Sequence, residues 1–414
     1  MRTAVVVLGD LGRSPRMQYH ALALAVDGSE VDLVGLEGAP LHAALTAEPR
    51  LRSHRLPDRA FASRAGHGRR RFVALSAARV SWQAARLLSS LLQLPKPDVI
   101  LVQTPPALPT LAVAWTVAKL RGARLVFDWH NLSHTILAVK LGDQHRAVRL
   151  LARSERRWAR RADAHLAVSR GLADFLRREW GVQSTVVYDR PAAFFAKPSL
   201  QASAELWSRL SRDYSLGARR IPLLVCPTSW TPDEDFDLLL EGLERAERIL
   251  IAQRGASDAG TPDVAVFMTG RGELRQAFEQ RVARRHFTRI AVRTAWLDPA
   301  DYPTLVGMAD VGLCLHQSSS GLDLPMKLAD FRGAGVPVCA YDYAPVLGEA
   351  VTPGREGIAF RDPNDLAQVV LALATADFGK VPQFAASRAW LAAHPAQHWD
   401  AQWQEHARAA ILGG

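Results

Sequence analysis

Cysteine is scarce in this chain of 414 residues, which contains only Cys226, Cys314 and Cys339. Each lies in a short apolar run typical of a strand, and the three show neither CxxC spacing nor a nearby histidine pattern. The scarcity excludes a disulfide-stabilised scaffold and argues against a zinc site. We therefore expect reduced thiols in the core of a cytoplasmic protein.

Long uninterrupted apolar runs are also missing. The longest apolar stretch, residues 99–120, is broken by Pro105, Pro106 and Pro109, so it resembles a strand, a loop and a helix rather than a membrane span of about 20 residues. The apolar run near the start is too short for a signal sequence, and arginines follow it instead of a cleavage site. The sequence therefore predicts neither a spanning helix nor a targeting signal.

Acidic residues are few in the first half of the chain. Residues 1–200 contain 30 Lys and Arg against 15 Asp and Glu, whereas residues 201–414 contain 21 against 26. This difference supports a domain boundary near residue 200. The basic half indicates an anionic partner such as a phosphate, a membrane surface or a nucleic acid. We expect no nucleic acid, because no nucleic-acid-binding module is recognisable and the loops suit a small anion.

Short Val- and Leu-rich runs alternate with helical patterns, which is typical of βαβ units around parallel sheets. The strands predicted in the first half are Thr3–Leu8, Val31–Gly35, Asp98–Val102, Arg124–Asp128, Ala164–Val168 and Thr185–Tyr188. Those predicted in the second half are Pro222–Cys226, Val264–Met268, Ile290–Val292, Val311–Leu315 and Pro337–Ala340. Helices are predicted at Leu75–Leu92, Pro109–Leu120 and Arg146–Arg161. Pro191–Arg220 is the expected linker, with a polar helix inside it.

This alternation predicts an α/β protein with two doubly wound, Rossmann-like domains that face each other across a crevice. The first domain is expected at residues 1–200 and the second at residues 201–395, with 396–414 as a C-terminal helix that packs back on the first domain. Ligands of such sheets bind at the carboxyl ends of the strands, so the loops that follow strands hold the candidate site residues.

The loop after the first strand has two glycines, which let the backbone approach a ligand, and two arginines near a helix N-terminus, where an anion is favoured. We expect these residues to bind an anion such as a phosphate; they are Gly9, Gly12, Arg13 and Arg16. Ser14 and Pro15 predict the start of the helix, and Asp10 is a candidate general base. The glycine spacing differs from the dinucleotide fingerprint. A tight turn with solvated arginines, in which Asp10 bonds its own backbone, is the alternative.

A second group of polar residues ends the strand near residue 128. Asp128 and Asn131 are candidates to contact a sugar, and His130 is the second candidate for the base. A capped turn explains the same residues equally well. We favour Asp10 slightly over His130, because its neighbouring glycines leave room for substrate, although histidine has the more suitable ordinary pKa.

In the second half, the loop after the strand at 222–226 contains a helix-start signal and two further residues that are not part of that signal. Thr231 and Glu234 match a capping box, so we expect them to be structural. Ser229 and Trp230 precede the helix and are predicted to face a ligand.

The turn after the strand at 264–268 has Gly270 and Gly272 on either side of Arg271. This arginine is a candidate contact for a phosphate or a base. A single GxG is a weak signal, and an ordinary turn is the alternative.

The most informative stretch is the small-residue loop and helix that begin at His316. Its amide groups and Lys327 are expected to hold a diphosphate, and Asp330 to accept from ribose hydroxyls. The other candidate ligand contacts here are His316, Ser319, Ser320, Gly321, Leu322 and Asp323. The alternative is a solvated row of ion pairs along the helix, with Asp323 as its cap.

The chain resembles the chitobiosyldiphosphodolichol beta-mannosyltransferases. The matching stretches are VVVLGDLGRSPRMQYHALALA, FDWHN, VYDRPAAFF, TSWTPDEDF, TGRGELR and SSSGLDLPMKLADFRGAGVPVCA, with a weaker match at HWDAQW. The resemblance implies the two-domain GT-B fold, GDP-mannose as donor, no cofactor or essential metal, and inversion to a β linkage. It also implies that Asp330 takes the place of the ribose-binding carboxylate and Lys327 that of a diphosphate contact.

The acceptor implied by the resemblance is a lipid-diphosphate-linked GlcNAc or chitobiose-type sugar. The resemblance implies that the second-half candidates bind the donor and that the first-half candidates bind this acceptor and its phosphate, namely Gly9, Gly12, Arg13, Arg16, Asp128 and Asn131. Eukaryotic members begin with a membrane-spanning anchor, whereas this chain starts at its first strand and has an Arg- and Ala-rich composition that looks bacterial. We therefore expect a bacterial-like member without the anchor, held peripherally on the cytoplasmic face of an anionic membrane by its basic half. The alternatives are a retaining GT-B glycosyltransferase that uses another nucleotide sugar, an epimerase of similar fold, and a non-catalytic sugar-nucleotide-binding protein.

Overall fold

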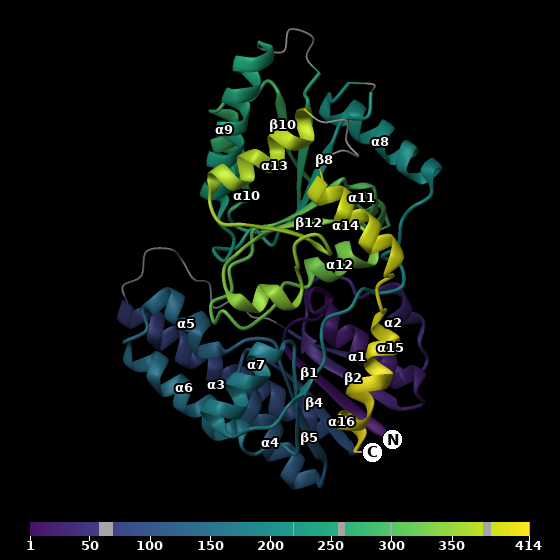
Figure 1. Ribbon diagram of the computed structural model, residues 1–414. Helices are drawn as coiled ribbons and strands as arrows, with labels where there is room; N and C mark the ends of the chain where they lie inside the picture. Colours follow the sequence, from purple (N-terminus) through teal and green to yellow (C-terminus); the bar gives the residue numbers. More distant parts are fainter. Residues whose placement is uncertain (58–68, 218, 256–260, 299, 376–381, 414) are drawn as a thin grey trace. The chain divides into compact units, whose positions relative to one another are not determined.

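The computed structural model describes residues 1–57, 69–217, 219–255, 261–298, 300–375 and 382–413 (Figure 1). The chain divides into two compact units. Unit 1 comprises Met1–Asp189 and Asp400–Gly414, and unit 2 comprises Arg190–Trp399. The chain thus passes from one unit to the other directly after Asp189, earlier than the boundary expected near residue 200.

Unit 1 is a doubly wound sheet with helices on its faces. Among the described residues its seven strands are parallel, in the order β3-β2-β1-β4-β5-β6-β7. The strands are β1 (Arg2–Asp10), β2 (Glu30–Leu36), β3 (Leu51–Leu56), β4 (Val99–Thr104), β5 (Arg124–Trp129), β6 (Ala164–Ala167) and β7 (Thr185–Val186). The helices are η1 (Leu11–Arg13), α1 (Pro15–Val26), α2 (Ala43–Ala47), α3 (Arg69–Gln93), α4 (Thr110–Arg121), α5 (Ser133–Leu141), α6 (Arg146–Ala159), α7 (Arg170–Phe175) and η2 (Leu176–Trp180).

Unit 2 has the same design. Its six described strands are also parallel, in the order β10-β9-β8-β11-β12-β13. They are β8 (Leu223–Pro227), β9 (Val264–Thr269), β10 (Ile290–Ala295), β11 (Val311–Cys314), β12 (Val338–Tyr341) and β13 (Gly357–Phe360). The helices are α8 (Leu200–Tyr214), α9 (Phe236–Arg254), α10 (Arg275–Ala283), α11 (Tyr302–Met308), α12 (Lys327–Gly333), η3 (Pro345–Glu349), α13 (Pro363–Thr375) and α14 (Pro382–Ala393).

Strand alternation builds the core of unit 2 on both faces of its sheet. Leu224 and Cys226 pack into one cluster with α9 and α13, whereas Leu223 and Val225 pack into the other with α8, α11 and α12. This follows from the period of two in a strand, because both faces of a parallel sheet are covered by helices. The cysteines expected in the core are buried and free, as predicted.

The end of the chain belongs to unit 1. It forms α15 (Trp399–Gln402), η4 (Trp403–Ala407) and α16 (Arg408–Leu412). The Trp403 indole donates to His20 Nδ1 (3.1 Å), and the Arg408 guanidinium binds Asp27 (2.9 and 3.0 Å). These long-range contacts attach the C-terminal helices to α1.

Three features of the fold were not predicted. Strands β3 and β13 lack the apolar run by which the other strands were predicted. Strand β3 is an edge strand with mostly exposed, polar residues, and β13 has only four residues. The expected linker is wrong for α8, which buries Trp207 and Leu210 in the core of unit 2.

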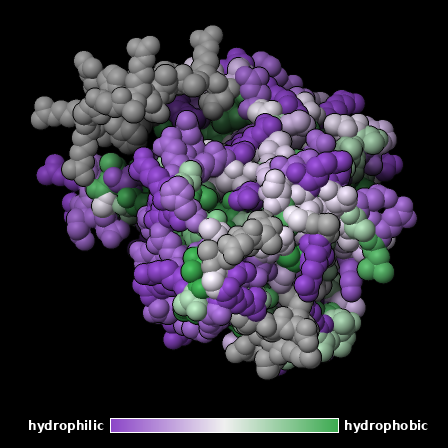
Figure 2. All heavy atoms as spheres, turned by 90° about the horizontal axis from the view of Figure 1, so that it is seen from above, coloured by the Kyte–Doolittle hydropathy of each residue, from purple (hydrophilic) through white to green (hydrophobic). Residues whose placement is uncertain are grey.

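Among the described helices, none is long and apolar enough to cross a membrane. In the face shown in Figure 2, hydrophilic side chains predominate over hydrophobic ones in the described part of the chain.

Candidate active site

Three loops of unit 2 meet at the carboxyl edge of its sheet. The loops follow β8, β9 and β11, which hold the second-half candidate residues. The Thr228 N–H donates to the Thr269 carbonyl (2.7 Å), and the Gln317 N–H donates to the Asp233 carbonyl (2.7 Å). The structure therefore brings the predicted donor-site loops together.

Gly270 and Gly272 are needed for this close approach. A Cβ at Gly270, whose φ is +135°, would lie 1.8 Å from the Thr228 carbonyl oxygen, and one at Gly272 would lie 2.1 Å from that of Ser229. Their absence of side chains lets the β9 loop pack on the β8 loop. Both glycines thus have a structural role, whatever binds beside them.

Arg271 lies at the surface between these glycines. Its guanidinium carbon is 3.9 Å from the ring centroid of Trp296, which follows β10 and is 51% exposed. This stacking orients the guanidinium and creates a flat aromatic and cationic surface. The sequence pattern gave no signal for Trp296.

The capping box expected at Thr231 and Glu234 is wrong. Helix α9 begins later, at Phe236, and Asp235 caps it by accepting from the Leu238 N–H (2.9 Å). The Glu234 side chain instead turns into the interior.

Buried Glu234 organises the β8 loop. It accepts hydrogen bonds from the Ser229 and Trp230 N–H groups (3.0 and 3.2 Å) and from the Thr228 hydroxyl. Its second oxygen pairs with the Lys327 ammonium. The carboxylate that the sequence pattern assigned to a helix cap therefore binds a residue far along the chain.

Lys327 is the first residue of α12, and its side chain is 18% exposed. Burial by itself would lower the pKa of this lysine, but the Glu234 carboxylate raises it above its ordinary value. The ammonium is thus charged at neutral pH, and an ammonium has three N–H donors. Lys327 can hold Glu234 and an anion at the same time.

Trp230 does not face a ligand, contrary to the prediction. Its side chain is fully buried, and its ring stacks on Phe236 with centroids 5.0 Å apart. The neighbouring Ser229 is exposed. The β8 loop therefore keeps Ser229 as a donor-site candidate and uses Trp230 as core.

The small-residue loop after β11 folds around its own serine hydroxyls. Ser318 Oγ accepts from the Gly321 and Ser320 N–H groups (2.8 and 3.3 Å) and donates to Asp323, and Ser320 Oγ accepts from the Leu322 N–H (3.2 Å). Ser319 lies in the same loop. The Ser320, Gly321 and Leu322 amides, which were predicted to hold a diphosphate, therefore donate within the loop instead. Ser318 is a residue that the sequence reasoning missed.

Helix α12 begins at Lys327, so Asp323 and Leu322 remain in the loop before it. Asp323 does not cap the helix, whose N-cap residue is Met326. Asp330 lies on α12, three residues after Lys327, and is partly buried. This spacing puts the predicted ribose and diphosphate contacts on one side of a helix.

His316 forms a charged bridge between two carboxylates. Its Nδ1 lies 3.2 Å from Asp233 and its Nε2 lies 3.1 Å from Asp323. Burial opposes the charged form of the imidazole, but the two carboxylates raise its pKa to about 9. His316 is therefore an imidazolium at neutral pH. The loop that follows it leads to Lys327 at the start of α12.

In unit 1, Asp10 is bound by backbone amides. Its carboxylate accepts from the Gly12 N–H (2.9 Å) and from the Ala39 N–H (3.0 and 3.1 Å), and Arg13 lies 3.7 Å away. A Cβ at Gly38 would lie 2.3 Å from this carboxylate. The geometry favours the alternative in which Asp10 stabilises its own turn.

The helix predicted at Ser14 and Pro15 starts there, although the Ser14 hydroxyl donates back to the Asp10 carbonyl (2.9 Å) rather than capping. A Cβ at Gly9 would be in ordinary contact with the Val7 and Ser14 side chains (3.7 and 3.9 Å), and Gly12 packs against the Ala39 carbonyl. The Arg13 side chain is exposed. Of this loop, Gly9 and Arg13 thus remain accessible to an acceptor.

Arg16 and Asp128 bind each other in the interior of unit 1. The Arg16 Nε and Nη2 atoms donate to the two Asp128 oxygens (2.8 and 2.9 Å), and Nη1 donates to Asp189 and to the Val187 carbonyl (both 2.8 Å). Both side chains are fully buried. Arg16 and Asp128 therefore do not contact an acceptor directly, because a buried bidentate ion pair cannot reach a ligand in solvent. They support the neighbouring residues instead.

Asp128 also holds two histidines. Burial alone would raise its pKa, but Arg16 and His130 keep it well below the ordinary value, so it is ionised. His20 Nε2 lies 3.3 Å away, while His20 Nδ1 accepts from the Trp403 indole. Burial lowers the pKa of His20, which favours the neutral ring. Because Nδ1 accepts from the indole, the single proton of the neutral ring is on Nε2, facing the carboxylate.

His130 is the more exposed of the two histidines, at 19%. Its Nε2 lies 3.1 Å from Asp128. Since an ionised carboxylate can only accept, Nε2 donates to Asp128, and Nδ1 is the ring nitrogen that remains to face a substrate. A histidine oriented by a buried carboxylate is the arrangement of a general base. The geometry thus favours His130 over Asp10.

Asn131 follows and uses its side-chain oxygen to accept from the Leu132 N–H (2.7 Å). This bond supports the turn that leads into α5. Asn131 therefore supports the turn next to His130 but does not cap α5, whose first N–H groups, those of Ser133 and His134, are bound by Glu155.

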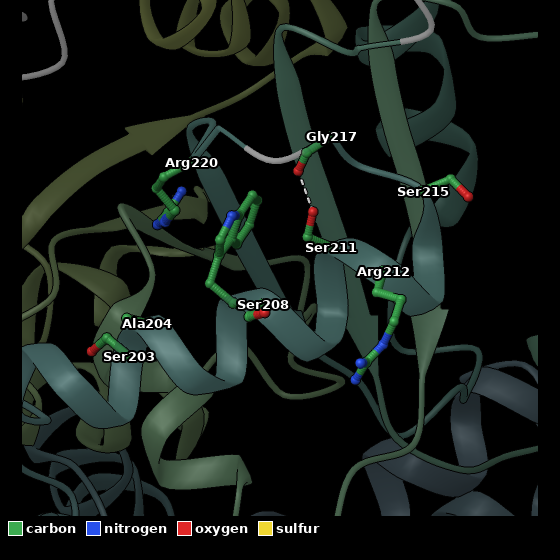
Figure 3. A pocket seen from close by; sticks show the side chains of 9 residues that line it. Ser203, Ala204, Ser208, Ser211, Arg212, Ser215, Gly217 and Arg220 are labelled. Carbon is green, nitrogen blue, oxygen red and sulfur yellow. Dashed lines mark hydrogen bonds between the residues drawn. The ribbon is translucent and has the colours of Figure 1, made fainter.

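A hollow of about 830 Å³ lies on unit 2 between α8 and the segment that follows it (Figure 3). Arg220 stacks over Trp207 there at 4.7 Å, and Ser211 donates to the Gly217 carbonyl. None of the predicted site residues lines it. Within the described residues, no three His, Cys, Asp or Glu side chains gather as metal ligands do.

Known proteins are similar to this chain over most of its length. Residues 12–188 match the family model described as a glycosyl transferase 4-like domain. The chitobiosyldiphosphodolichol beta-mannosyltransferase of Mus musculus is 36% identical over 97% of this chain and 87% of its own length, and that of Homo sapiens is 35% identical over 96% and 90%. The Arabidopsis thaliana protein named UDP-glycosyltransferase TURAN is 35% identical over 90% of this chain and 88% of its own length.

Solved structures show the same fold at lower identity. A sucrose-phosphate synthase from Thermosynechococcus elongatus has a TM-score of 0.68 and 16% identity, covering 98% of this chain and 97% of its own. Anabaena HepE in complex with UDP has a TM-score of 0.65 and 15% identity, covering 98% of both chains. Two parallel Rossmann-like sheets with these neighbours identify the GT-B fold.

Proposed function

Because the chain belongs to the chitobiosyldiphosphodolichol beta-mannosyltransferase family, we propose that it moves mannose from GDP-mannose to a lipid-diphosphate-linked chitobiose-type acceptor and forms a β linkage. It is a glycosyltransferase, and beta-mannosyl transfer to a chitobiosyl lipid is the activity named for its relatives. The donor's nucleotide, the absence of a metal requirement and a cytoplasmic membrane surface as the working place are part of the proposal.

The observation that supports a donor site most strongly is the set of paired charges at the carboxyl edge of unit 2. As the sugar leaves, its nucleoside diphosphate gains negative charge, which preorganised cations and amides stabilise. Lys327, at the start of α12 directly after the small-residue loop, is a cation fixed by buried Glu234. Asp330, one turn along α12, is the matching acceptor for ribose hydroxyls.

His316 contributes a second fixed cation. Its imidazolium is held by Asp233 and Asp323, and Asp323 also accepts a hydrogen bond from the Ser318 hydroxyl. A bound diphosphate would thus meet a loop whose position is set by charge pairs rather than by the ligand. Such preorganisation reduces the cost of stabilising the leaving group.

On the acceptor side, His130 is proposed as the base. In an inverting transfer the base removes a proton from the acceptor hydroxyl, the oxygen forms the bond to the anomeric carbon, and the bond to the diphosphate breaks. His130 Nδ1 takes the proton, and Asp128 stabilises the imidazolium that forms. Arg16 and His20 keep Asp128 in place.

A donor screen on the full chain tests the proposal. Purified protein is given a short-chain chitobiosyl diphosphate lipid together with GDP-mannose, or with UDP-sugars as the comparison that the plant relative's name suggests. We expect mannosylated product only with GDP-mannose, and a β-configured linkage by NMR. An α linkage would contradict inversion, and transfer from a UDP-sugar alone would overturn the donor assignment.

A further inference from the structure

Helix α6 (Arg146–Ala159) presents a continuous basic face to solvent. Its exposed residues recur at intervals of three and four, as one side of a helix requires. With Arg160, which follows the last turn, this α6 arginine face consists of Arg146, Arg149, Leu150, Arg153, Arg156, Arg157 and Arg160. The fold does not need this composition, since the opposite side of the helix, with Val148 and Ala159, supplies the buried contacts.

The acidic residue of α6 points away from this face. Glu155 is fully buried and accepts from the Ser133 and His134 N–H groups (2.7 and 3.0 Å) and from His134 Nδ1 (2.6 Å). It thereby fixes the start of α5 (Ser133–Leu141) against α6, and Figure 1 shows the two helices next to each other. The helix therefore offers no counter-ion to its own arginines.

Most of these arginines also have no ion pair elsewhere. Among the residues that the structure describes, no acidic side chain pairs with Arg146, Arg149, Arg153, Arg156 or Arg157. Arg160 donates to the Trp180 carbonyl (2.9 Å). Nearby Asp143 and Asp163 are exposed in the loops before and after the helix.

The arginines surround a hollow. Arg153, Arg156, Arg157, Arg160 and Arg161 line a surface depression of about 450 Å³. Arg161 is held at its edge by stacking on Trp115 and Trp158, at 4.7 and 5.1 Å. Five guanidinium groups around one depression suit a phosphate-bearing head group, because guanidinium binds phosphate through two parallel hydrogen bonds.

Aliphatic side chains accompany the charge. Leu150, within the α6 arginine face, is 63% exposed, and the adjacent α5 exposes Val139 (67%) and Ile136 (40%) next to Lys140. A nucleic acid offers no apolar environment for such side chains, whereas a bilayer offers anionic head groups above acyl chains. The combination favours a lipid surface over another polyanion.

We propose that the α6 arginine face is the surface by which unit 1 docks on an anionic phospholipid bilayer, with Leu150 entering the acyl boundary. The inference rests on the proposed function only in its purpose, which is to keep the enzyme at a membrane that holds a lipid-linked acceptor. The binding itself depends on charge and exposed apolar area and is measurable without any substrate.

The test compares two triple variants of the full chain in vesicle flotation. Arg149→Gln/Arg153→Gln/Arg156→Gln removes charge from the α6 arginine face. Arg50→Gln/Arg52→Gln/Arg55→Gln removes the same charge from exposed positions at and beside β3 in the same unit. Vesicles contain phosphatidylglycerol with phosphatidylcholine, or phosphatidylcholine alone.

Each arginine near an anionic surface is worth about a fivefold change in partitioning, so the α6 triple variant should bind on the order of 100-fold more weakly. The β3 triple variant should bind the mixed vesicles nearly as the unmodified chain does, and neither should bind phosphatidylcholine strongly. Equal losses in both triple variants would overturn the assignment of the surface, because charge alone would then explain binding.

A labelled variant separates lipid from nucleic acid. The native cysteines are buried, so Leu150→Cys can carry an environment-sensitive dye at the surface. We expect a blue shift with mixed vesicles and none with duplex DNA. No shift with vesicles, or the larger shift with DNA, would overturn the proposal.

Transfer to a water-soluble, short-chain acceptor distinguishes this inference from the proposed function. The α6 triple variant should transfer mannose to that acceptor as fast as the unmodified chain. If the unmodified chain transfers nothing, the proposed function fails. If it transfers mannose but the vesicle results are equal for all variants, the docking surface fails.

Discussion

Replacing Lys327 by methionine tests the donor site most directly. Methionine keeps much of the length and apolar volume of the lysine side chain and removes its charge. A charge-assisted hydrogen bond to a diphosphate is worth about 1.5–3 kcal/mol, so Lys327→Met should weaken GDP binding roughly 10- to 150-fold. The structure predicts this loss because the ammonium is fixed by Glu234 at the end of the small-residue loop.

The same substitution also leaves Glu234 buried without its cation. The Ser229 and Trp230 amides and the Thr228 hydroxyl still bind the carboxylate. Even so, removal of one partner of a buried pair typically costs about 3–5 kcal/mol. A loss of GDP affinity in Lys327→Met alone would therefore mix a lost contact with a weakened unit.

The double variant Lys327→Met/Glu234→Gln separates the two effects. A glutamine oxygen can still accept from the loop amides, and no unpaired charge remains in the interior. We expect its urea midpoint to return towards that of the unmodified chain, while its GDP affinity by calorimetry stays as weak as in the single variant. Lys197→Met is the matched control, since Lys197 is an exposed lysine of the same unit.

The refuting result is clear for this pair of variants. If the folded double variant binds GDP as tightly as the Lys197→Met control, Lys327 does not contact the diphosphate, and the donor site lies elsewhere.

Two further predictions concern titratable groups. His130→Ala should lower turnover by a factor of about 10² or more with GDP affinity unchanged. Asp10→Asn should retain near-normal turnover, because the Asp10 carboxylate is bound by the amides of its own turn and of Ala39. The opposite ranking in steady-state assays would return the base to Asp10. The pKa of His316 is raised to about 9 from an ordinary 6.5, so its stabilising contribution is complete below pH 6.5 and lost as the pH rises through 9. Denaturant unfolding of the unmodified chain should lose on the order of 3 kcal/mol over that range relative to His316→Gln, and parallel pH profiles of the two proteins would contradict the charged bridge.

Some features of the site were readable from local sequence. The short Val- and Leu-rich runs predicted most strands. They therefore also located the loops at the carboxyl ends of the strands, where Gly270 and His130 lie and after which α12 begins with Lys327. Strand pattern and turn glycines are decided by backbone geometry within a few residues, which is why they are visible without a structure. The resemblance of the SSSGLDLPMKLAD stretch likewise needed only the order of residues.

Partners that lie far apart in the chain were decided only by the tertiary structure. Glu234 looked like a helix cap because Thr231 stands three residues before it, but its partner Lys327 is 93 residues away. Arg16 looked like a solvated anion contact at a helix start, but the fold buries it against Asp128, 112 residues away. Burial decides these cases, because a charge removed from water must find an opposite charge wherever the packing supplies one.

The choice between Asp10 and His130 has the same origin. Asp10 is bound by the amide of Ala39, 29 residues away, which occupies its oxygens. His130 is oriented by Asp128, whose ionisation depends on Arg16 from α1, and His20 beside it takes its tautomer from Trp403 in the C-terminal segment. The sequence alone determined the class of fold and the loops that carry the chemistry. Which side chains remain available for chemistry depends on long-range packing, because hydrogen-bond partners are assigned only when distant segments meet.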